Sequence, residues 1–278
     1  MKTPLFAIGG PSVCEGDYLG DDGLLRCGKC GGPKQVRVSF AGRLIEPVCL
    51  CRCEKEALAA EESRLKKSQR DRRLLSSPAA TLSINYDRNA TFNLGTDVSR
   101  AESLVRTFAR AWPQMAAEGH GLALIGPVGT GKTYAAAALA NAVCAQGSSV
   151  LFTSVPRVEA ALWDAKGRSR VSLLESLALF DLLIIDDLGC ERATDYMDEQ
   201  AFVVVDERYR SGKPLVTTTN IPLRELKNPD ALSRLRIYDR VLERCQPIIF
   251  DGDSWRPRIA EQRRARLLAA FDEVERKD

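Results

Sequence analysis

From about residue 120 onward, short apolar runs alternate with longer segments whose apolar residues recur at helical spacing. The apolar runs predict five strands, over residues 122–125, 150–153, 182–185, 215–218 and 248–250. The segments between them predict four helices, over residues 132–146, 157–177, 199–209 and 231–244. This alternation predicts an α/β fold with a five-stranded parallel sheet that is covered on both faces. In such a sheet, ligands bind beyond the carboxyl ends of the strands.

The first part of the chain lacks this alternation. Residues 1–53 are rich in Gly and Cys and too few to hold a core without a staple. Residues 54–75 are dominated by Glu, Lys, Arg, Ala and Leu, which favours a helix that ends at Ser76-Ser77-Pro78. We therefore predict a small module over 1–53, a helical linker over 54–84, a main domain over 85–262 and a charged tail over 263–278. Residues 261–278 are expected to form a short helix.

Composition narrows the class of protein only a little. The chain has 278 residues, of which 45% are hydrophobic and 28% charged, and its formal net charge is +3. This near-neutral balance gives no indication about nucleic acid. No apolar run is long enough to cross a bilayer, and residues 1–10 lack a convincing signal-peptide core. We therefore expect a cytoplasmic protein without a membrane partner.

A complete P-loop pattern stands between the first predicted strand of the sheet and an alanine-rich helix. Its residues are Gly126, Pro127, Val128, Gly129, Thr130, Gly131, Lys132 and Thr133. The glycines allow backbone N–H groups to turn toward phosphate oxygens at a helix N-terminus. In this pattern the Lys reaches the β/γ-phosphates and the Thr hydroxyl ligates Mg²⁺. A glycine-rich turn without a ligand is the alternative, but strand, loop, Lys and Thr together predict an ATP site.

Two further predicted strands also end in polar residues. Asp186 and Asp187 follow the run 182–185, and we expect Asp186 to hold Mg²⁺ beside Thr133 while Asp187 polarises the attacking water. Many related ATPases carry Glu at the second position, so the shorter Asp187 predicts slow hydrolysis. Asn220 follows the run 215–218 and either reaches the γ-phosphate or the water, or starts a turn before Pro222.

Arginines gather near the last predicted helix. These are Arg234, Arg236, Arg240 and Arg244, of which three share one helical face at i, i+4 spacing. One interpretation is a solvated basic face. The other is an arginine that enters the ATP site of a neighbouring subunit and stabilises transferring charge. A further arginine, Arg256, follows in Asp253-Ser254-Trp255-Arg256.

Cysteine is the most unusual component of the N-terminal module. The chain has nine cysteines, and five of them lie between Cys27 and Cys53. In a reducing compartment such clustering indicates metal rather than disulfides. Cys27 and Cys30 form a CxxC knuckle, and Cys51 with Cys53 completes the four ligands of a structural zinc site. Cys49 is a plausible substitute, and a set of free thiols is the alternative.

Several motifs together carry a family likeness. In order along residues 90–259 they read GPVGTGKT, LLIIDDLG, TTTN, IYDRVLERC and DSWR. This set resembles the DnaC/DnaI-type bacterial helicase loaders, which are AAA+ ATPases similar to IstB transposition helpers. The resemblance implies that Asn220 is the sensor-1 residue, Arg240 the arginine finger and Arg256 the sensor-2 arginine. Together with Asp187, these residues would form the catalytic set.

The resemblance also implies partners. Members of this family assemble side by side into rings or spirals, bind the replicative DNA helicase through an N-terminal region, and bind single-stranded DNA. We therefore expect a helicase loader that acts in replication initiation. The alternatives are an IstB-like transposition helper acting on target DNA, a small-molecule kinase, and a scaffold with negligible turnover. The cysteine module favours the loader, and neither the lid nor the acceptor pocket of a kinase is evident.

Overall fold

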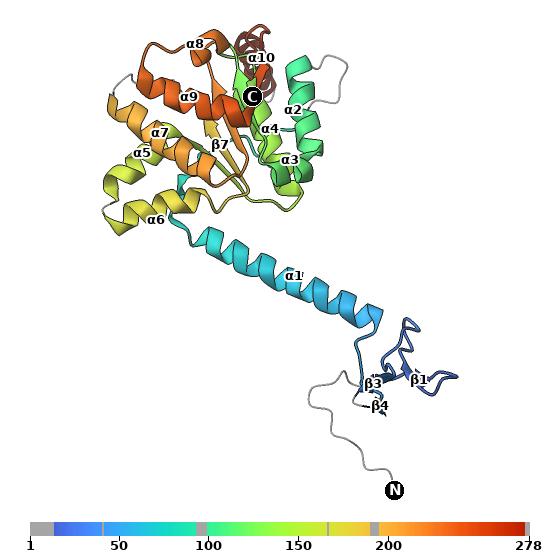
Figure 1. The fold of residues 1–278 in the computed structure, drawn as a ribbon. Coiled ribbons are helices and arrows are strands. Elements are labelled where there is room, and N and C mark those ends of the chain that lie inside the picture. The colour runs from blue at the N-terminus through green and yellow to red at the C-terminus, as the bar shows by residue number, and fades with distance from the viewer. Residues whose placement is uncertain (1–13, 41, 93–98, 166, 190–194, 276–278) are drawn as a thin grey trace. The chain divides into compact units, whose positions relative to one another are not determined.

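The computed structural model describes residues 14–40, 42–92, 99–165, 167–189 and 195–275 (Figure 1). The chain divides into two compact units, Met1–Arg73 and Leu74–Asp278. Residues 1–10, where the sequence lacks a convincing signal-peptide core, lie outside the described residues. Within the described part of the chain, every helix is too short or too polar to cross a membrane.

The first unit consists of two small hairpins and a long helix. Strand β1 (Tyr18–Leu19) pairs with β2 (Leu25–Arg26), β3 (Val38–Phe40) pairs with β4 (Arg43–Ile45), and helix α1 (Arg52–Leu75) follows. Few side chains of this unit are buried: Phe40 is 72% exposed and Leu44 is 74% exposed. Cys27 and Cys51, by contrast, are buried. Burial in the hairpins therefore concentrates around the cysteines rather than in an apolar core.

The second unit is built on a parallel sheet. Its strands are β5 (Gly121–Ile125), β6 (Val150–Ser154), β7 (Leu182–Asp186), β8 (Leu215–Thr219) and β9 (Cys245–Ile249), in the order β6-β7-β8-β5-β9. The predicted fold class and all five strands are confirmed. Strand β9 begins at Cys245 rather than at residue 248, and it contains Pro247. Proline is tolerated there because β9 pairs only with β5 and forms the edge of the sheet.

Helices cover both faces of this sheet (Figure 1). They are α2 (Arg100–Arg110), α3 (Trp112–Glu118), α4 (Lys132–Ala145), α5 (Val155–Asp164), α6 (Arg168–Leu177), α7 (Asp195–Arg210), α8 (Leu223–Lys227) and α9 (Leu232–Arg244), with a 3₁₀ turn at Pro78–Leu82. The expected single helix over 157–177 was wrong, because two helices, α5 and α6, occupy this stretch. Between them Gly167 has φ 54°, a conformation that glycine adopts without strain.

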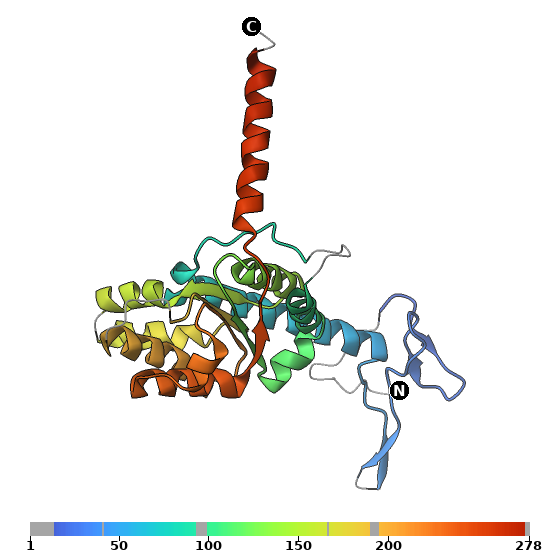
Figure 2. The ribbon, with the colours of Figure 1, turned by 90° about the horizontal axis from the view of Figure 1, so that it is seen from above.

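The C-terminal helix is longer than expected. Instead of a short helix within 261–278, α10 runs over Arg256–Glu275 (Figure 2). Helix α10 starts directly after Trp255, whose backbone contacts the P-loop residue Gly129.

The strands send alternate side chains to two apolar cores. Leu183 and Ile185 of β7 join the core formed with α5, α6, α7 and α9. Leu182 and Ile184 join the core on the opposite face, formed with α2 and α4. A sheet that is buried on both sides is a rigid support, so it fixes the carboxyl ends of β5, β7 and β8 relative to one another. These three ends carry the polar residues of the candidate site.

Candidate functional site

The loop between β5 and α4 has a backbone that requires glycine. Gly129 and Gly131 have φ values of 86° and 97°, which other residues rarely adopt. At Gly126 a Cβ atom would lie 2.0 Å from the carbonyl oxygen of Phe250, and at Gly129 it would lie 2.1 Å from Ser254 Oγ. The loop is therefore folded tightly under the segment that leads into α10.

We expect Gly126→Ala to lower the free energy of unfolding by about 1–3 kcal/mol, because the added methyl group overlaps a backbone carbonyl that the sheet holds in place. Gly252→Ala is the matched control, since a Cβ there meets nothing within 4 Å. Urea denaturation of both variants measures the difference. Equal stability of the two variants would contradict the close approach of Phe250 to the loop.

Lys132 connects the loop to the end of β8. Its side chain is buried, and Nζ donates to Gly126 O at 2.7 Å, to Pro127 O at 2.8 Å and to Asn220 Oδ1 at 2.7 Å. These three oxygens carry no net charge, so they orient the ammonium without neutralising it. An ammonium placed this way at the start of a helix is well suited to bind a phosphate oxygen.

The end of β7 lies beside the first turn of α4. Thr133 Oγ1 donates to Asp186 Oδ1 at 3.0 Å, and Thr218 Oγ1 of β8 donates to the same oxygen at 2.7 Å. Burial raises the pKa of Asp186 above its ordinary value, against the effect of the two hydroxyl donors. A hydroxyl and a carboxylate in contact offer the oxygen ligands that Mg²⁺ prefers, so these residues fit a magnesium ion.

Asp187 has the only positive φ, 55°, among the non-glycine residues that the structure describes. Its backbone N–H donates to Thr218 Oγ1 at 2.9 Å, and its side chain is exposed. Strained conformations of this kind concentrate at functional sites. Asp187 is one of the residues that line the hollow above the P-loop.

This hollow has a volume of about 1090 Å³ and is open to solvent. Its wall includes the P-loop, the first residues of α2, Asp187, Asn220 and the segment from Phe250 to Ile259, with Arg256 among them. The segment is anchored where Trp255 N–H donates to Gly129 O at 2.9 Å. The hollow is large enough for a nucleotide. It brings Lys132, Asp187, Asn220 and Arg256 around one space.

Arg240 lies elsewhere. It projects from α9 onto α7, where Nε is 2.9 Å from Asp206 Oδ1 and the guanidinium lies 4.6 Å from the ring centroid of Phe202. Among the described residues that line the hollow, Arg240 does not appear. Within one chain it therefore has no access to the nucleotide site that Lys132 marks.

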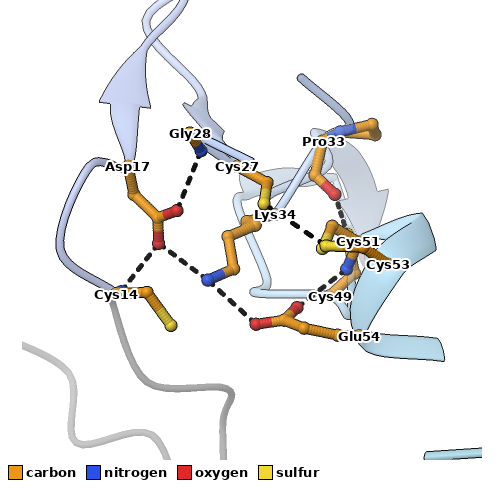
Figure 3. A network of polar contacts seen from close by, with 10 residues as sticks. All are labelled: Cys14, Asp17, Cys27, Gly28, Pro33, Lys34, Cys49, Cys51, Cys53 and Glu54. Carbon is orange, nitrogen blue, oxygen red and sulfur yellow. Dashed lines mark hydrogen bonds and ion pairs between the residues drawn. The ribbon is translucent and has the colours of Figure 1, made fainter. Parts of the chain in front are cut away.

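Four cysteines of the first unit form a compact cluster. The Sγ atoms of Cys27, Cys30, Cys51 and Cys53 all lie within 4.8 Å of one another. Cys49 is not one of these four, and its Sγ donates to Pro33 O at 3.5 Å (Figure 3). Backbone N–H groups of Cys53 and Gly32 lower the pKa of Cys30 to about 6, which favours the thiolate that a metal binds. The cluster fits a tetrahedral zinc ion with four sulfur ligands.

Two parts of the nucleotide site were not predicted. Thr218 supports both Asp186 and Asp187, but no signal separates it from the neighbouring threonines of β8. The start of α2 also lines the hollow. The start of this helix could have been predicted, because Ser99 followed three residues later by Glu102 is typical of a helix N-terminus. In the structure Ser99 Oγ accepts the Glu102 N–H at 3.1 Å.

Known proteins resemble part of this chain. The replicative helicase loader DnaC of Escherichia coli strain K12 is 34% identical over 138 residues, 48% of this chain and 55% of DnaC. A putative insertion-sequence ATP-binding protein of Mycobacterium tuberculosis is 31% identical over 148 residues, 50% of this chain and 57% of the relative. The chain spans about half the length of these curated relatives.

Among solved structures, AMPPCP-bound DnaA from Aquifex aeolicus superposes with a TM-score of 0.50 at 19% identity, over 60% of this chain and 51% of that one. This likeness supports the AAA+ fold. The family described as IstB-like ATP binding protein matches residues 56–264. Since this match covers more than half of the chain, the protein belongs to the family of IstB-like ATP-binding proteins and is homologous to the helicase loader DnaC, as its motifs indicated.

Proposed function

We propose that this chain is an ATP-dependent loader that binds the replicative DNA helicase and helps to place it on single-stranded DNA in the cytoplasm. The observation that carries the proposal is the contact of Lys132 Nζ with Asn220 Oδ1 at 2.7 Å. It joins the phosphate-binding loop to a polar group at the end of the next strand of the sheet. A γ-phosphate bound at Lys132 would compete for this contact, so the site can respond to ATP.

From the residues around the hollow, we infer that the chain hydrolyses ATP. Mg²⁺, held by Thr133 and Asp186, would offset the charge of the phosphates. Asp187 is the candidate to orient the attacking water, and Arg256 is the candidate to contact the γ-phosphate from the start of α10. The aspartate side chain is one methylene shorter than glutamate, so we expect slow turnover.

We assign Arg240 to the site of a neighbouring subunit in a homo-oligomer. In the single chain this arginine is held by Asp206 and stacked on Phe202. A neighbour's ATP would offer a stronger anionic partner than one carboxylate. A ring or spiral of subunits would therefore complete each site across an interface.

Arg240→Ala should leave ATP affinity unchanged but lower the rate of hydrolysis at least tenfold, because an arginine finger acts on the transition state. Asp187→Asn should also lower hydrolysis, but this variant still carries Arg240. Mixing the two inactive variants should restore part of the activity, since each Asp187→Asn chain donates its arginine to an intact neighbouring site. Steady-state phosphate release measures all three samples. A mixture as inactive as its components would argue against the role of Arg240 in trans.

The N-terminal module, over residues 1–53, is the candidate for holding the helicase. Its cysteine cluster would bind a structural zinc, since all four ligands are thiols and no position remains for a reacting water. The module belongs to the compact unit Met1–Arg73, which contains none of the nucleotide-site residues, so it can specialise in binding a protein partner.

A second function has a specific observation in its favour. The relative from Mycobacterium tuberculosis is described as an ATP-binding protein in an insertion sequence, at 31% identity. A transposition helper acting on target DNA would use the same nucleotide site. The two functions therefore differ in the protein partner rather than in the chemistry of the site.

Affinity purification of the tagged full-length chain from its source cell, with ATP and Mg²⁺ present, separates the two functions. We expect the replicative helicase to co-purify, and Lys132→Ala to reduce its recovery. Recovery of a transposase without the helicase would replace the loader by the transposition helper.

A further inference from the structure

A buried lysine lies next to the cysteine cluster. Lys34 is 1% exposed, and its ammonium forms ion pairs with Asp17 at 2.7 Å and with Glu54 at 2.9 Å (Figure 3). Burying an ammonium is costly unless it is fully paired, and here two carboxylates meet it. Burial of a lysine is unusual in a unit whose apolar residues are mostly exposed. Its burial therefore points to a specific role for this network.

The two carboxylates reach different halves of the cysteine cluster. Asp17 accepts the N–H of Gly28, which follows Cys27, at 3.1 Å. Glu54 accepts the N–H of Cys51 at 3.0 Å. Lys34 therefore bridges the CxxC half and the CxC half of the cluster through hydrogen bonds to their backbones (Figure 3).

The main chain of Lys34 strengthens this bridge. Its N–H donates to Leu25 O at 2.8 Å, and its carbonyl accepts the N–H of Cys49 at 2.7 Å. Lys34 thus lies between β2, which leads to Cys27, and the segment at Cys49 that leads to Cys51. Both its backbone and its ammonium hold these two segments together.

Glu54 also fixes the start of α1. Helix α1 begins at Arg52, so Cys51 occupies the N-cap position and Glu54 the third helical position. A glutamate at this position that accepts the N–H of the N-cap residue forms half of a capping box. Two members of the cluster, Cys51 and Cys53, therefore lie in the turn that Glu54 caps.

The charges of the network support one another. Hydrogen bonding to Asp17, followed by that to Glu54, raises the pKa of Lys34 well above its usual range. Hydrogen bonding to Lys34 lowers the pKa of the Asp17 and Glu54 carboxyls. Removal of one of the three groups would leave its ion-pair partners with an unpaired charge.

We propose that Lys34, Asp17 and Glu54 form an ion-pair clip that positions the two halves of the cysteine cluster, so that metal retention depends on a lysine that is not a ligand. The inference rests on the proposed zinc site. Groups that orient metal ligands commonly change metal affinity by about 10–100-fold when they are removed. The clip would also tie the presence of metal to the first turn of α1.

The test is the rate at which a chromogenic chelator removes zinc from the full-length chain. Lys34→Met should release zinc about 10–100-fold faster than the unmodified protein. Lys55→Met is the matched control, because Lys55 is exposed and lies one residue beyond Glu54; it should release zinc at the unmodified rate. Equal rates for Lys34→Met and Lys55→Met would overturn the clip.

Glu54→Gln keeps the test decisive if Lys34→Met fails to fold. Glutamine retains an oxygen for the Cys51 N–H but removes the charge that meets Lys34, so zinc release should still accelerate. Where Lys34→Met does fold, the double variant Lys34→Met/Glu54→Gln should accelerate zinc release by less than the product of the two single accelerations, because the same ion pair is broken in each. Zinc release from Glu54→Gln at the unmodified rate, or a double variant whose acceleration equals that product, would overturn the clip. A folded, unmodified protein without zinc would instead reject the zinc site itself.

Discussion

Lys132→Ala is expected to weaken ATP binding by about 100-fold or more. The lysine ammonium is buried under the P-loop, aligned by two loop carbonyls and by Asn220. A hydrogen bond to a charged group contributes about 1.5–3 kcal/mol, and each 1.4 kcal/mol corresponds to a factor of ten in affinity. The triphosphate would lose the contact with the buried ammonium of Lys132. Asn220 would at the same time lose the donor that orients it.

Isothermal titration with ATP and Mg²⁺ measures this loss. Lys227→Ala is the matched control, since Lys227 belongs to the same unit but is exposed on α8. Far-UV circular dichroism should show that both variants keep the native helix content. An Lys132→Ala variant that retained the affinity of the control would show that the nucleotide binds elsewhere.

Arg208→Met should produce the largest loss of stability, about 3–5 kcal/mol. The guanidinium is fully buried and donates to the carbonyl oxygens of Phe180, Asp181 and Pro214 at 2.6–2.9 Å. These carbonyls precede β7 and β8, so Arg208 fastens the start of two neighbouring strands. Each buried acceptor left without a donor costs about 1–3 kcal/mol. Burial lowers the pKa of Arg208 to about 9, so the side chain stays protonated at neutral pH.

The midpoint of urea denaturation reports this effect. Arg210→Met is the control, because the Arg210 side chain is 73% exposed, unlike Arg208, and forms an ion pair with Asp206. We expect the control to change the free energy of unfolding by less than about 1 kcal/mol. Similar losses in both variants would contradict the structural role of Arg208. ATP should still bind to the folded fraction of Arg208→Met, since the arginine contacts the amino ends of the strands, opposite the P-loop.

Sequence patterns predicted the sheet well because each strand contains a short apolar run, and β7 and β8 are followed by the polar residues Asp187 and Asn220. The run from Leu182 to Asp187 shows both signals within six residues. The ends of the helices were harder to predict from the sequence. Gly167 alone marks the break between α5 and α6, and a single glycine in a helical pattern is often tolerated. Pro247 concealed the start of β9, because only the strand order shows that this strand lies at an edge.

The polar networks were the least predictable part of the molecule. Lys34 looks like an ordinary lysine in a polar loop, and its burial depends on Asp17 and Glu54, which come from distant positions in the sequence. Arg208 likewise lies in a helix with many charged residues, and nothing in its spacing predicts that it is fully buried. In both cases the tertiary structure brings together partners that no local pattern connects.

We propose that nucleotide at the Lys132 site controls how this chain holds the replicative helicase. The most direct measurement is the dissociation constant between the purified full-length chain and the helicase of its source cell, with ATP and Mg²⁺ and without nucleotide. We predict that the two constants differ at least tenfold and that Lys132→Ala abolishes the difference. Equal constants with and without ATP, or no binding to the helicase under either condition, would contradict the claim.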